Sequence, residues 1–481
     1  MAFGADPAPP LREVLFAMPK GGDLHNHLSG AAYAETFLEL AKRDEMCIDK
    51  QQLAIVECPS PTTGTIVPAS TAFSDSSLYS AMLDAMSMRQ FRPVAESGHD
   101  HFFNTFGKFS AVSRRHVPEV LTEVVSRFAT ENVDYVETTF SPDLGEWRSL
   151  TPLISGTTFR EMYDSIAKNP ENAKKLDEVV AIARKTLDDA ESYMQKTLRC
   201  GTADAKAGCD STVRYNYELY RGTPREFFFA GLMVGYTLAG VDPRVVGVNP
   251  VMPEDGYLSM TQFDEQMRMF AFFRQLHPKV HLTTHAGELT LGLVPIEGLR
   301  YHIRDSVMVA GAERIGHGVD ITYERGATEL MKHMATRGIA VEVCLTSNDV
   351  ILGVRGRDHP LGLYLAHGVP VALATDDPGV SRDDMTNQYM RAVREHGLKY
   401  EQLKRIARNT LEYSFLEGES LWTKRRYDSI NPACQSAPSA RCSSFLAKNT
   451  KARLQWRLEQ RLRDFESAYA VTTIDSAHPN N

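Results

Sequence analysis

The chain has 481 residues, and its 53 basic and 61 acidic side chains give a formal charge of −8. A hydrophobic fraction of 43% and a charged fraction of 24% are ordinary for a globular protein, which excludes a disordered chain or a small disulfide-stapled scaffold. The acidic balance argues against a nucleic-acid-binding protein, and the longest apolar run, Phe227 to Val241, is too short to span a membrane.

Short β-rich runs alternate with helical stretches along the chain. The expected strands are Gly22–Leu28, Asp134–Phe140, Phe227–Tyr236, Val245–Val251, Val280–His285, Arg314–His317, Ile339–Thr346 and Pro370–Thr375. Their apolar runs are mostly continuous, which is typical of parallel strands buried on both faces. Eight strands alternating with helices such as Phe263–Leu276 predict an α/β protein of the (β/α)₈ barrel type, with a doubly wound open sheet as the alternative.

Three stretches look like additions to a barrel. We expect a leader over 1–17, a barrel over 18–418, and a C-terminal extension over 419–481 with a helix near Lys448–Tyr469 and a loose tail. Within the barrel segment, we expect a Pro-, Ser- and Thr-rich loop that contains Cys47 and Cys58, and a largely helical insertion over about 143–225.

Six of the seven cysteines form three local pairs in polar, turn-rich stretches. The pairs are Cys47/Cys58, Cys200/Cys209 and Cys434/Cys442. None has the C-x-x-C spacing typical of structural zinc, so we predict disulfides and a periplasmic or secreted protein. Reduced cysteines in a cytoplasmic protein are the alternative. The remaining Cys344 lies in an apolar run and is expected to be a buried free thiol.

The first ten residues have neither the basic nor the apolar region of a secretory signal. We interpret them as a leader that follows a removed signal peptide, preceded by a start methionine.

Imidazoles and carboxylates gather at the C-terminal ends of the predicted strands. His25 and His27 end the first strand, and residues at i and i+2 of a strand point to the same side. His285, His317 and the pair Asp376-Asp377 end later strands, and Glu288 follows His285 by three residues. Barrel active sites are built at this face, and a set without clustered thiolates suits a catalytic Zn²⁺ with one open position.

Four motifs carry a resemblance to a known family. They are Pro19-Lys20-x-x-Asp-Leu-His25-x-His27-Leu, Thr284-His-Ala-Gly-Glu288, Arg314-Ile-Gly-His-Gly318 and Thr375-Asp-Asp-Pro378. In this order they resemble the motifs of the adenosine deaminase family, which belongs to the zinc amidohydrolase barrels. The resemblance runs from about Met18 to Gly418, apart from the helical insertion. The paired loop cysteines are similar to those of its secreted adenosine deaminase-related growth factor branch.

The resemblance implies a role for each matching residue. His25, His27, His285 and Asp376 would bind one Zn²⁺, which lowers the pKa of water toward neutrality. Glu288 would protonate the purine at N1 and His317 would orient and deprotonate the attacking water, whereas Asp377 would hydrogen-bond N7. The chemistry fits these groups, because attack on an aromatic carbon needs a strong nucleophile and a proton donor at the adjacent nitrogen.

The resemblance also places Ser29, Met252 and Gly287 against the substrate. Two of these depart from the family pattern. Ser29 stands where the family has an acidic residue for the ribose 5′-hydroxyl, and serine offers a shorter reach and no charge. Met252 stands where the Asp-Leu-x-Gly-x-Glu pattern has its glycine, while Glu254 is retained. These changes leave the zinc chemistry unaltered and change recognition.

The leading prediction is therefore a zinc-dependent hydrolase that converts adenosine, or a close 6-aminopurine nucleoside, to the 6-oxo product (inosine for adenosine) and ammonia. Adenine and a 5′- or N6-modified adenosine remain alternative substrates. A catalytically retired adenosine-binding signalling protein is the alternative of another class, and the intact zinc set argues against it. A cyclic-amide hydrolase with two metals is disfavoured, because no lysine ends a strand near the site. The partner is a small molecule, and the sequence leaves a homodimer open.

Overall fold

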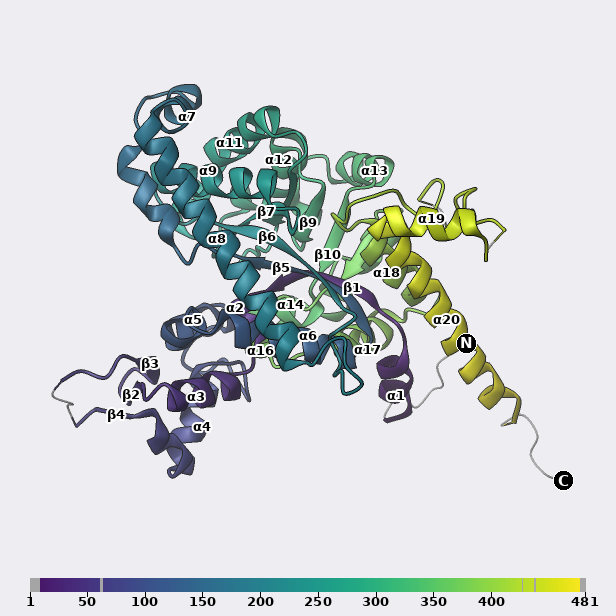
Figure 1. The fold of residues 1–481 in the computed structure, drawn as a ribbon, viewed down its shortest axis with the longest axis horizontal. Helices are drawn as coiled ribbons and strands as arrows, with labels where there is room; N and C mark the ends of the chain where they lie inside the picture. Colours follow the sequence, from purple (N-terminus) through teal and green to yellow (C-terminus); the bar gives the residue numbers. More distant parts are fainter. Residues whose placement is uncertain (1–8, 61–63, 426, 437, 476–481) are drawn as a thin grey trace.

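A ring of eight parallel strands forms the centre of the computed structural model, which describes residues 9–60, 64–425, 427–436 and 438–475 (Figure 1). The strands follow one another in chain order around the ring. They are β1 (Gly21–His27), β5 (Val133–Phe140), β6 (Thr212–Tyr220), β7 (Val245–Val251), β8 (His281–Ala286), β9 (Arg314–His317), β10 (Ala340–Val343) and β11 (Val371–Leu373).

The ring is nearly closed by contacts between its first and last members. Asn26 of β1 pairs in parallel with Asp376, which follows β11. The backbone N–H of His27 donates to the carbonyl of Asp376 (3.0 Å), and that of Asp376 donates to the carbonyl of His25 (2.9 Å). The predicted barrel is thus confirmed. Its closure brings His25 and His27, at the end of the first strand, next to Asp376, which follows the last strand.

The third strand differs from the prediction. Phe227–Tyr236 lies in helix α9 (Arg225–Val241), and the third strand of the barrel is β6. Nearly every residue of this apolar run is buried, and a continuous apolar run fits a buried helix as well as a buried strand. β6 instead alternates Arg214, Asn216 and Glu218 with apolar and aromatic neighbours, which is the period of a strand. It lies inside the stretch 143–225, so the non-barrel part of that stretch ends before Thr212.

Helices surround the ring and fill the connections between its strands. They include α8 (Pro170–Thr197) after β5, α9 after β6, α11 (Phe263–Leu276) after β7, α13 (Ala327–Arg337) after β9, and α15 (Leu361–Ala366) after β10. Both α17 (Met385–His396) and α18 (Tyr400–Glu412) follow β11. Shorter helices along the same connections are α7 (Phe159–Ala167), α10 (Tyr257–Thr261), α12 (His302–Asp305), α14 (Leu345–Leu352) and α16 (Pro378–Ser381). Short 3₁₀ or π segments are η2 (Glu146–Leu153), η3 (Ile296–Leu299), η4 (Ser306–Ala310), η5 (Ile321–Tyr323) and η6 (Gly356–Asp358).

A separate group of elements lies between β1 and β5 and stands out to one side of the barrel in Figure 1. It contains a small antiparallel sheet of β2 (Cys47–Asp49), β3 (Ala54–Val56) and β4 (Ile66–Pro68). The helices of this connection are α2 (Leu28–Ala31), α3 (Ala34–Arg43), η1 (Ala69–Phe73), α4 (Ser76–Ala85), α5 (Gly98–Ser113) and α6 (Val117–Thr130). Helix α5 packs on α14 and thereby covers the end of the barrel where the strands finish.

The two terminal segments pack on the barrel through helices. Residues 9–17 of the predicted leader form α1, and residues 1–8 lie outside the described residues. The C-terminal extension contains α19 (Ala440–Lys448) and α20 (Thr450–Asp475). Leucines 458 and 462 of α20 pack against Leu24 and Leu411, and Arg408 of α18 holds Glu459 through two 2.7 Å contacts. The tail 476–481, predicted to be loose, lies outside the described residues.

All three predicted cysteine pairs are disulfide bonds. The Cα–Cα distances are 5.0 Å for Cys47–Cys58, 5.2 Å for Cys200–Cys209 and 4.5 Å for Cys434–Cys442. Cys344 is a buried free cysteine, located just after β10 at the start of α14. Three disulfides are compatible with an extracellular or periplasmic location. Within the described residues, the helices are too short or too polar to cross a membrane.

Candidate metal centre and substrate cavity

Four buried side chains from three parts of the ring converge on one point. They are His25 and His27 from β1, His285 from β8 and Asp376 after β11, and their ligand atoms lie within 4.8 Å of one another. The Nε2 atoms of His25 and His27 are each 3.0 Å from Nε2 of His285. Oδ1 of Asp376 lies 3.4 Å from Nε2 of His25 and 3.3 Å from Nε2 of His27.

The protonation of two of these rings follows from what their other nitrogen contacts. Nδ1 of His25 donates to Glu342 (2.7 Å), and Nδ1 of His285 donates to Oδ1 of Asn249 (2.9 Å). In the neutral state that metal binding requires, Nδ1 carries the proton of each of these two rings, so both Nε2 atoms present lone pairs to each other. Lone pairs at 3.0 Å repel unless a cation lies between them, and a His₃Asp set suits Zn²⁺. The four residues therefore fit the predicted metal.

Burial and the interactions among the four residues shift the pKa values of His285 and Asp376. Burial lowers the pKa of His285 well below its ordinary value, and the neighbouring imidazoles of His25 and His27 lower it further. Burial alone would raise the pKa of Asp376, but hydrogen bonds from His25 and His27 hold it well below the usual range. An ionised carboxylate beside a neutral imidazole is the protonation state that a metal needs.

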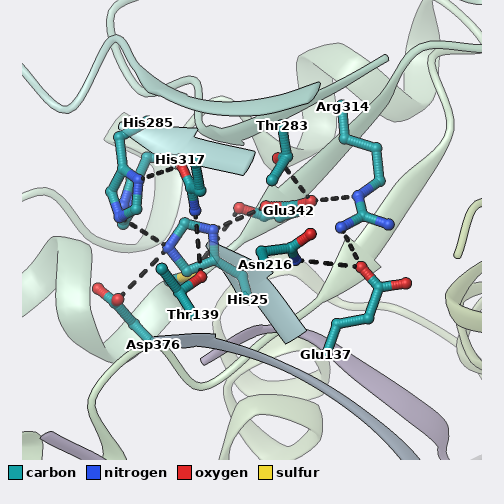
Figure 2. Close-up of polar contacts among 12 residues, drawn as sticks. His25, Glu137, Thr139, Asn216, Thr283, His285, Arg314, His317, Glu342 and Asp376 are labelled. Carbon is teal, nitrogen blue, oxygen red and sulfur yellow. Dashed lines mark hydrogen bonds and ion pairs between the residues drawn. The ribbon is translucent and has the colours of Figure 1, made fainter. Parts of the chain in front are cut away.

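A chain of buried polar contacts leads from His25 into the barrel interior, as Figure 2 shows. Glu342 of β10 accepts from His25 and from Thr283, and it pairs with the guanidinium of Arg314, which also pairs with Glu137. Burial would raise the pKa of Glu342, but Arg314 and His25 lower it to about 2. The carboxylate is therefore charged, and it fixes the tautomer and orientation of His25.

Glu288 has the environment of a proton donor. Its side chain lines the cavity, and its Oε1 atom is buried without a hydrogen-bond partner among the described residues. Burial raises its pKa well above the ordinary value, and the charges of Asp376 and Glu254 raise it further. Glu254, buried after β7, accepts hydrogen bonds from the backbone N–H groups of Gly287 (3.1 Å) and Glu288 (2.8 Å). Glu254 thus holds the backbone that presents Glu288.

His317 lies at the end of β9 directly against the metal ligands. Its ring centroid is 4.8 Å from that of His25 and 5.1 Å from that of His285. Nδ1 accepts from Asn348 (3.1 Å), and Nε2 has no partner among the described residues. Burial lowers the pKa of His317 to about 3, which keeps the ring neutral. Its backbone φ is +68°, as that of Asp376 is +62°, and such left-handed residues gather at functional sites.

A cavity of about 470 Å³ opens over this centre. His27, His285, Glu288 and Asp376 lie in its wall. The other lining residues include Ser29, Phe102, Phe103, Phe106, Phe109, Arg114, Phe140, Ser141, Arg148, Glu218, Tyr220, Met252 and Asp377. Three of the residues predicted to contact substrate therefore face this cavity. Gly287 does not line it; its φ is +75°, and a Cβ there would meet Asp320 at 2.4 Å.

Asp377 turns its carboxyl into the cavity rather than capping a helix. It precedes Pro378 at the start of α16, but its side chain makes no cap hydrogen bond and its Oδ1 has no partner among the described residues. Burial and the adjacent Asp376 raise its pKa well above the ordinary value. The carboxyl packs so closely against Gly30 that a Cβ there would lie 1.7 Å from Oδ1, which requires glycine at that position.

Met252 occupies the position with a backbone that favours glycine. Its φ is +85°, in the left-handed region that a side chain rarely adopts. The sequence places Met252 at the glycine of the family pattern, and the structure retains the backbone that such a glycine would allow. Its side chain is 39% exposed, lines the cavity and lies near Gly222.

Several residues of the site were not found from the sequence. Glu342 and Arg314 orient His25, Asn249 orients His285, and the hydroxyl of Ser347 donates to Asp376 (2.7 Å). Glu342 did carry a signal, since it is the one charged residue in the apolar run Ile339–Leu345. Glu218 was missed together with its strand.

Comparisons with known proteins agree with this site. A family model described as "Adenosine deaminase" matches residues 244–424. An adenosine deaminase of Escherichia coli (strain SMS-3-5 / SECEC) is 39% identical over 140 residues, which cover 29% of this chain and 39% of that protein. One from Salmonella heidelberg (strain SL476) is 41% identical over 141 residues, with the same coverage. The chain thus spans about two fifths of the length of the curated relatives it matches.

Solved structures share the fold at low identity. Arabidopsis ADAL in complex with IMP has a TM-score of 0.56 and 18% identity, covering 94% of this chain and 99% of that one. An adenine deaminase from Arthrobacter aurescens has a TM-score of 0.53 and 16% identity over 83% and 94%. An amidohydrolase from Burkholderia ambifaria with bound Zn has a TM-score of 0.54 and 16% identity over 97% of each.

The matched segment contains His285, Glu288, His317 and Asp376, and the structure brings His25 and His27 to them from outside that segment. Residues 244–424 thus match the adenosine deaminase family, and the motifs and the barrel of the chain are similar to those of that family.

Proposed function

We propose that the protein is a zinc-dependent enzyme that hydrolytically deaminates adenosine, or a close 6-aminopurine nucleoside, to the 6-oxo product and ammonia. The observation that supports this most directly is the convergence of His25, His27, His285 and Asp376 in the wall of one cavity that also holds Glu288. A metal site with an acid beside it in a cavity of nucleoside size is the arrangement that hydrolytic deamination needs.

Each residue takes a role that its environment supports. His25, His27, His285 and Asp376 would hold one Zn²⁺ per chain, and that ion would lower the pKa of a water toward neutrality. Glu288, kept protonated by its raised pKa, donates to N1 of the purine and makes C6 electrophilic. His317, a neutral ring whose Nδ1 accepts from Asn348, carries its proton on the unpartnered Nε2 and orients the attacking water by donating to it. Asp377, also with a raised pKa, donates to N7 through its unpartnered carboxyl.

The residues that line the cavity are compatible with more than one 6-aminopurine substrate. Ser29 and Met252 both line the cavity and both depart from the family pattern, so adenine and 5′- or N6-modified adenosines remain candidate substrates. The solved relatives span this range, since one is named an adenine deaminase and another an N6-mAMP deaminase. The three disulfides support action in the periplasm or outside the cell.

A substrate panel tests the proposal. Purified protein is incubated with adenosine, adenine, N6-methyladenosine and AMP, and both the fall in purine absorbance and the release of ammonia are followed, with and without a zinc chelator. We expect chelator-sensitive turnover of at least one nucleoside. Tight binding of adenosine without turnover, in protein that holds zinc, would contradict the proposal and favour the retired signalling protein.

A further inference from the structure

One carboxylate in the cavity has no part in the chemistry described above. Glu218 lies near the end of β6 and lines the cavity with Ser141 and Tyr220. Its Oε2 accepts a hydrogen bond from the hydroxyl of Tyr220 (2.8 Å) and a longer one from Ser141 (3.4 Å). Its Oε1 has no hydrogen-bond partner among the described residues. This half of the carboxylate is available to a ligand.

The surroundings of Glu218 are largely apolar. Phe140 precedes Ser141, and helix α5 contributes four phenylalanines to the same cavity. Burial raises the pKa of Glu218, although His27 and the Tyr220 hydroxyl oppose that shift. Because Glu218 is only partly buried and lines the cavity, a hydrogen-bond donor in the cavity can reach its Oε1. A donor on the bound substrate would satisfy it.

The two arginines that line the cavity do not make the region around Glu218 a binding site for an anion. Arg148 stacks its guanidinium on Trp147 (4.6 Å) and donates to the carbonyl of Gly145 (3.4 Å). Arg114 is exposed at the end of α5, and its positive charge acts on Glu218, whose pKa it lowers. A negatively charged substituent near Glu218 would therefore meet a carboxylate, while the two arginines of the cavity lining, Arg114 and Arg148, are exposed.

We propose that Glu218 is a specificity-determining residue that accepts a hydrogen bond from a sugar hydroxyl of the substrate and disfavours a 5′-phosphate. Of the four acidic residues that line the cavity, Glu288, Asp376 and Asp377 have roles in the proposed reaction and Ser29 carries no charge, so Glu218 is the carboxylate left to accept from the sugar. The inference rests on the proposed function, because it names which aminopurine the same site prefers: a neutral nucleoside rather than a nucleotide.

The test compares adenosine, AMP and adenine in the wild type, in Glu218→Gln, and in the matched control Glu146→Gln, which changes an exposed carboxylate outside the cavity lining. The wild type should prefer adenosine to AMP by at least about 100-fold in kcat/KM. A hydrogen bond to a charged group is worth roughly a 10- to 100-fold factor. Glu218→Gln should therefore lower kcat/KM for adenosine by about that factor, mainly through KM, and narrow the gap to AMP at least about tenfold. Adenine, which has no sugar, should be unaffected, as should every substrate in Glu146→Gln.

Glu218→Asp keeps the charge and shortens the reach. It should lose adenosine affinity but retain the discrimination against AMP, and it replaces Glu218→Gln as the test if that variant does not fold. An unchanged adenosine-to-AMP ratio in Glu218→Gln, or an equal loss with adenine, would overturn the assignment while leaving the deaminase intact. A zinc-loaded wild type inactive on all three compounds would overturn the proposed function and this assignment with it.

Discussion

The two halves of the barrel contribute different things to the site. The half from β7 to β11 carries Glu288, His317, His285 and Asp376, and it coincides with the segment that matches the family model. The half from β1 to β6 contributes two ligands, but otherwise supplies the cavity wall, with Glu218 and the phenylalanines of α5, and two of the three disulfides.

This division shows how one reaction can be kept while its substrate changes. The metal set and the proton donor occupy strand ends whose backbones are fixed by the barrel, and altering them removes the chemistry. Many wall residues, such as the phenylalanines of α5, lie on connections, which can vary in length without disturbing the ring, whereas Glu218 lies on β6. Variants of residues in the two halves are therefore expected to differ in their effects on activity, metal binding and stability.

The largest effect is expected at the proton donor. Glu288→Gln keeps the size of the side chain and removes the titrating carboxyl, so we expect kcat to fall by more than about 10³-fold while zinc content is retained. Single-turnover kinetics and metal analysis of the same sample measure both. Substantial activity in this variant would show that Glu288, in the half matched by the family model, is not the proton donor.

A disulfide in the other half is expected to affect stability alone. Cys47 and Cys58 are 11 residues apart in sequence, and the loop-entropy relation gives about 3 kcal/mol for such a closure. The double variant Cys47→Ala/Cys58→Ala should lose about that much free energy of unfolding in denaturant titrations, with kcat and zinc content unchanged. Reductant should destabilise the wild type more than the variant. Equal sensitivity of the two would count against the disulfide.

The polar chain behind His25 should tune metal affinity. Glu342→Gln removes the charge that pairs with Arg314 and orients His25, and loss of such a partner costs about 10- to 100-fold in metal affinity. Competition with a chromogenic chelator measures the zinc dissociation constant. The matched control is Glu313→Gln, whose carboxylate contacts His281 away from the metal and should leave zinc affinity unaltered. Equal affinities would remove Glu342 from the metal site.

The smallest effect concerns the left-handed backbone at Met252. Alanine keeps the Cβ that this φ disfavours and glycine removes it, so Met252→Gly should be more stable than Met252→Ala by about 0.5–1 kcal/mol. At Met260, inside helix α10, the order should reverse by about 1 kcal/mol. Denaturant titration of the four variants checks the sign. The same order at both positions would refute the strained backbone.

The four candidate metal ligands could be predicted from sequence because they lie at strand ends in local motifs. His25 and His27 lie on one face of the same strand. His285 and Asp376 each lie in a recognisable motif of no more than five residues. No contact across the barrel had to be known. The partners of these ligands were different: Glu342 is 317 residues from His25, and only the folded ring brings them together.

The strand error in the first half has a local cause. The run from Phe227 is apolar enough to be a buried strand or a buried helix, and its length favours the helix that the structure contains. The true strand β6 alternates as strands do, but it follows a 28-residue helix and was absorbed into the helical insertion. Because β6 was not predicted, Glu218 was missed as well. The proposed specificity residue therefore lies in the part of the cavity that local sequence patterns did not reveal.

The central claim is that one zinc ion at the four converging residues enables deamination. Metal-free protein, titrated with Zn²⁺ while ammonia release from adenosine is followed, tests it most directly. We expect no turnover without metal, a linear rise to one equivalent per chain and a plateau beyond it, with His285→Ala failing to respond. Turnover that is independent of zinc, or a plateau at two equivalents, would refute a single catalytic zinc at these residues.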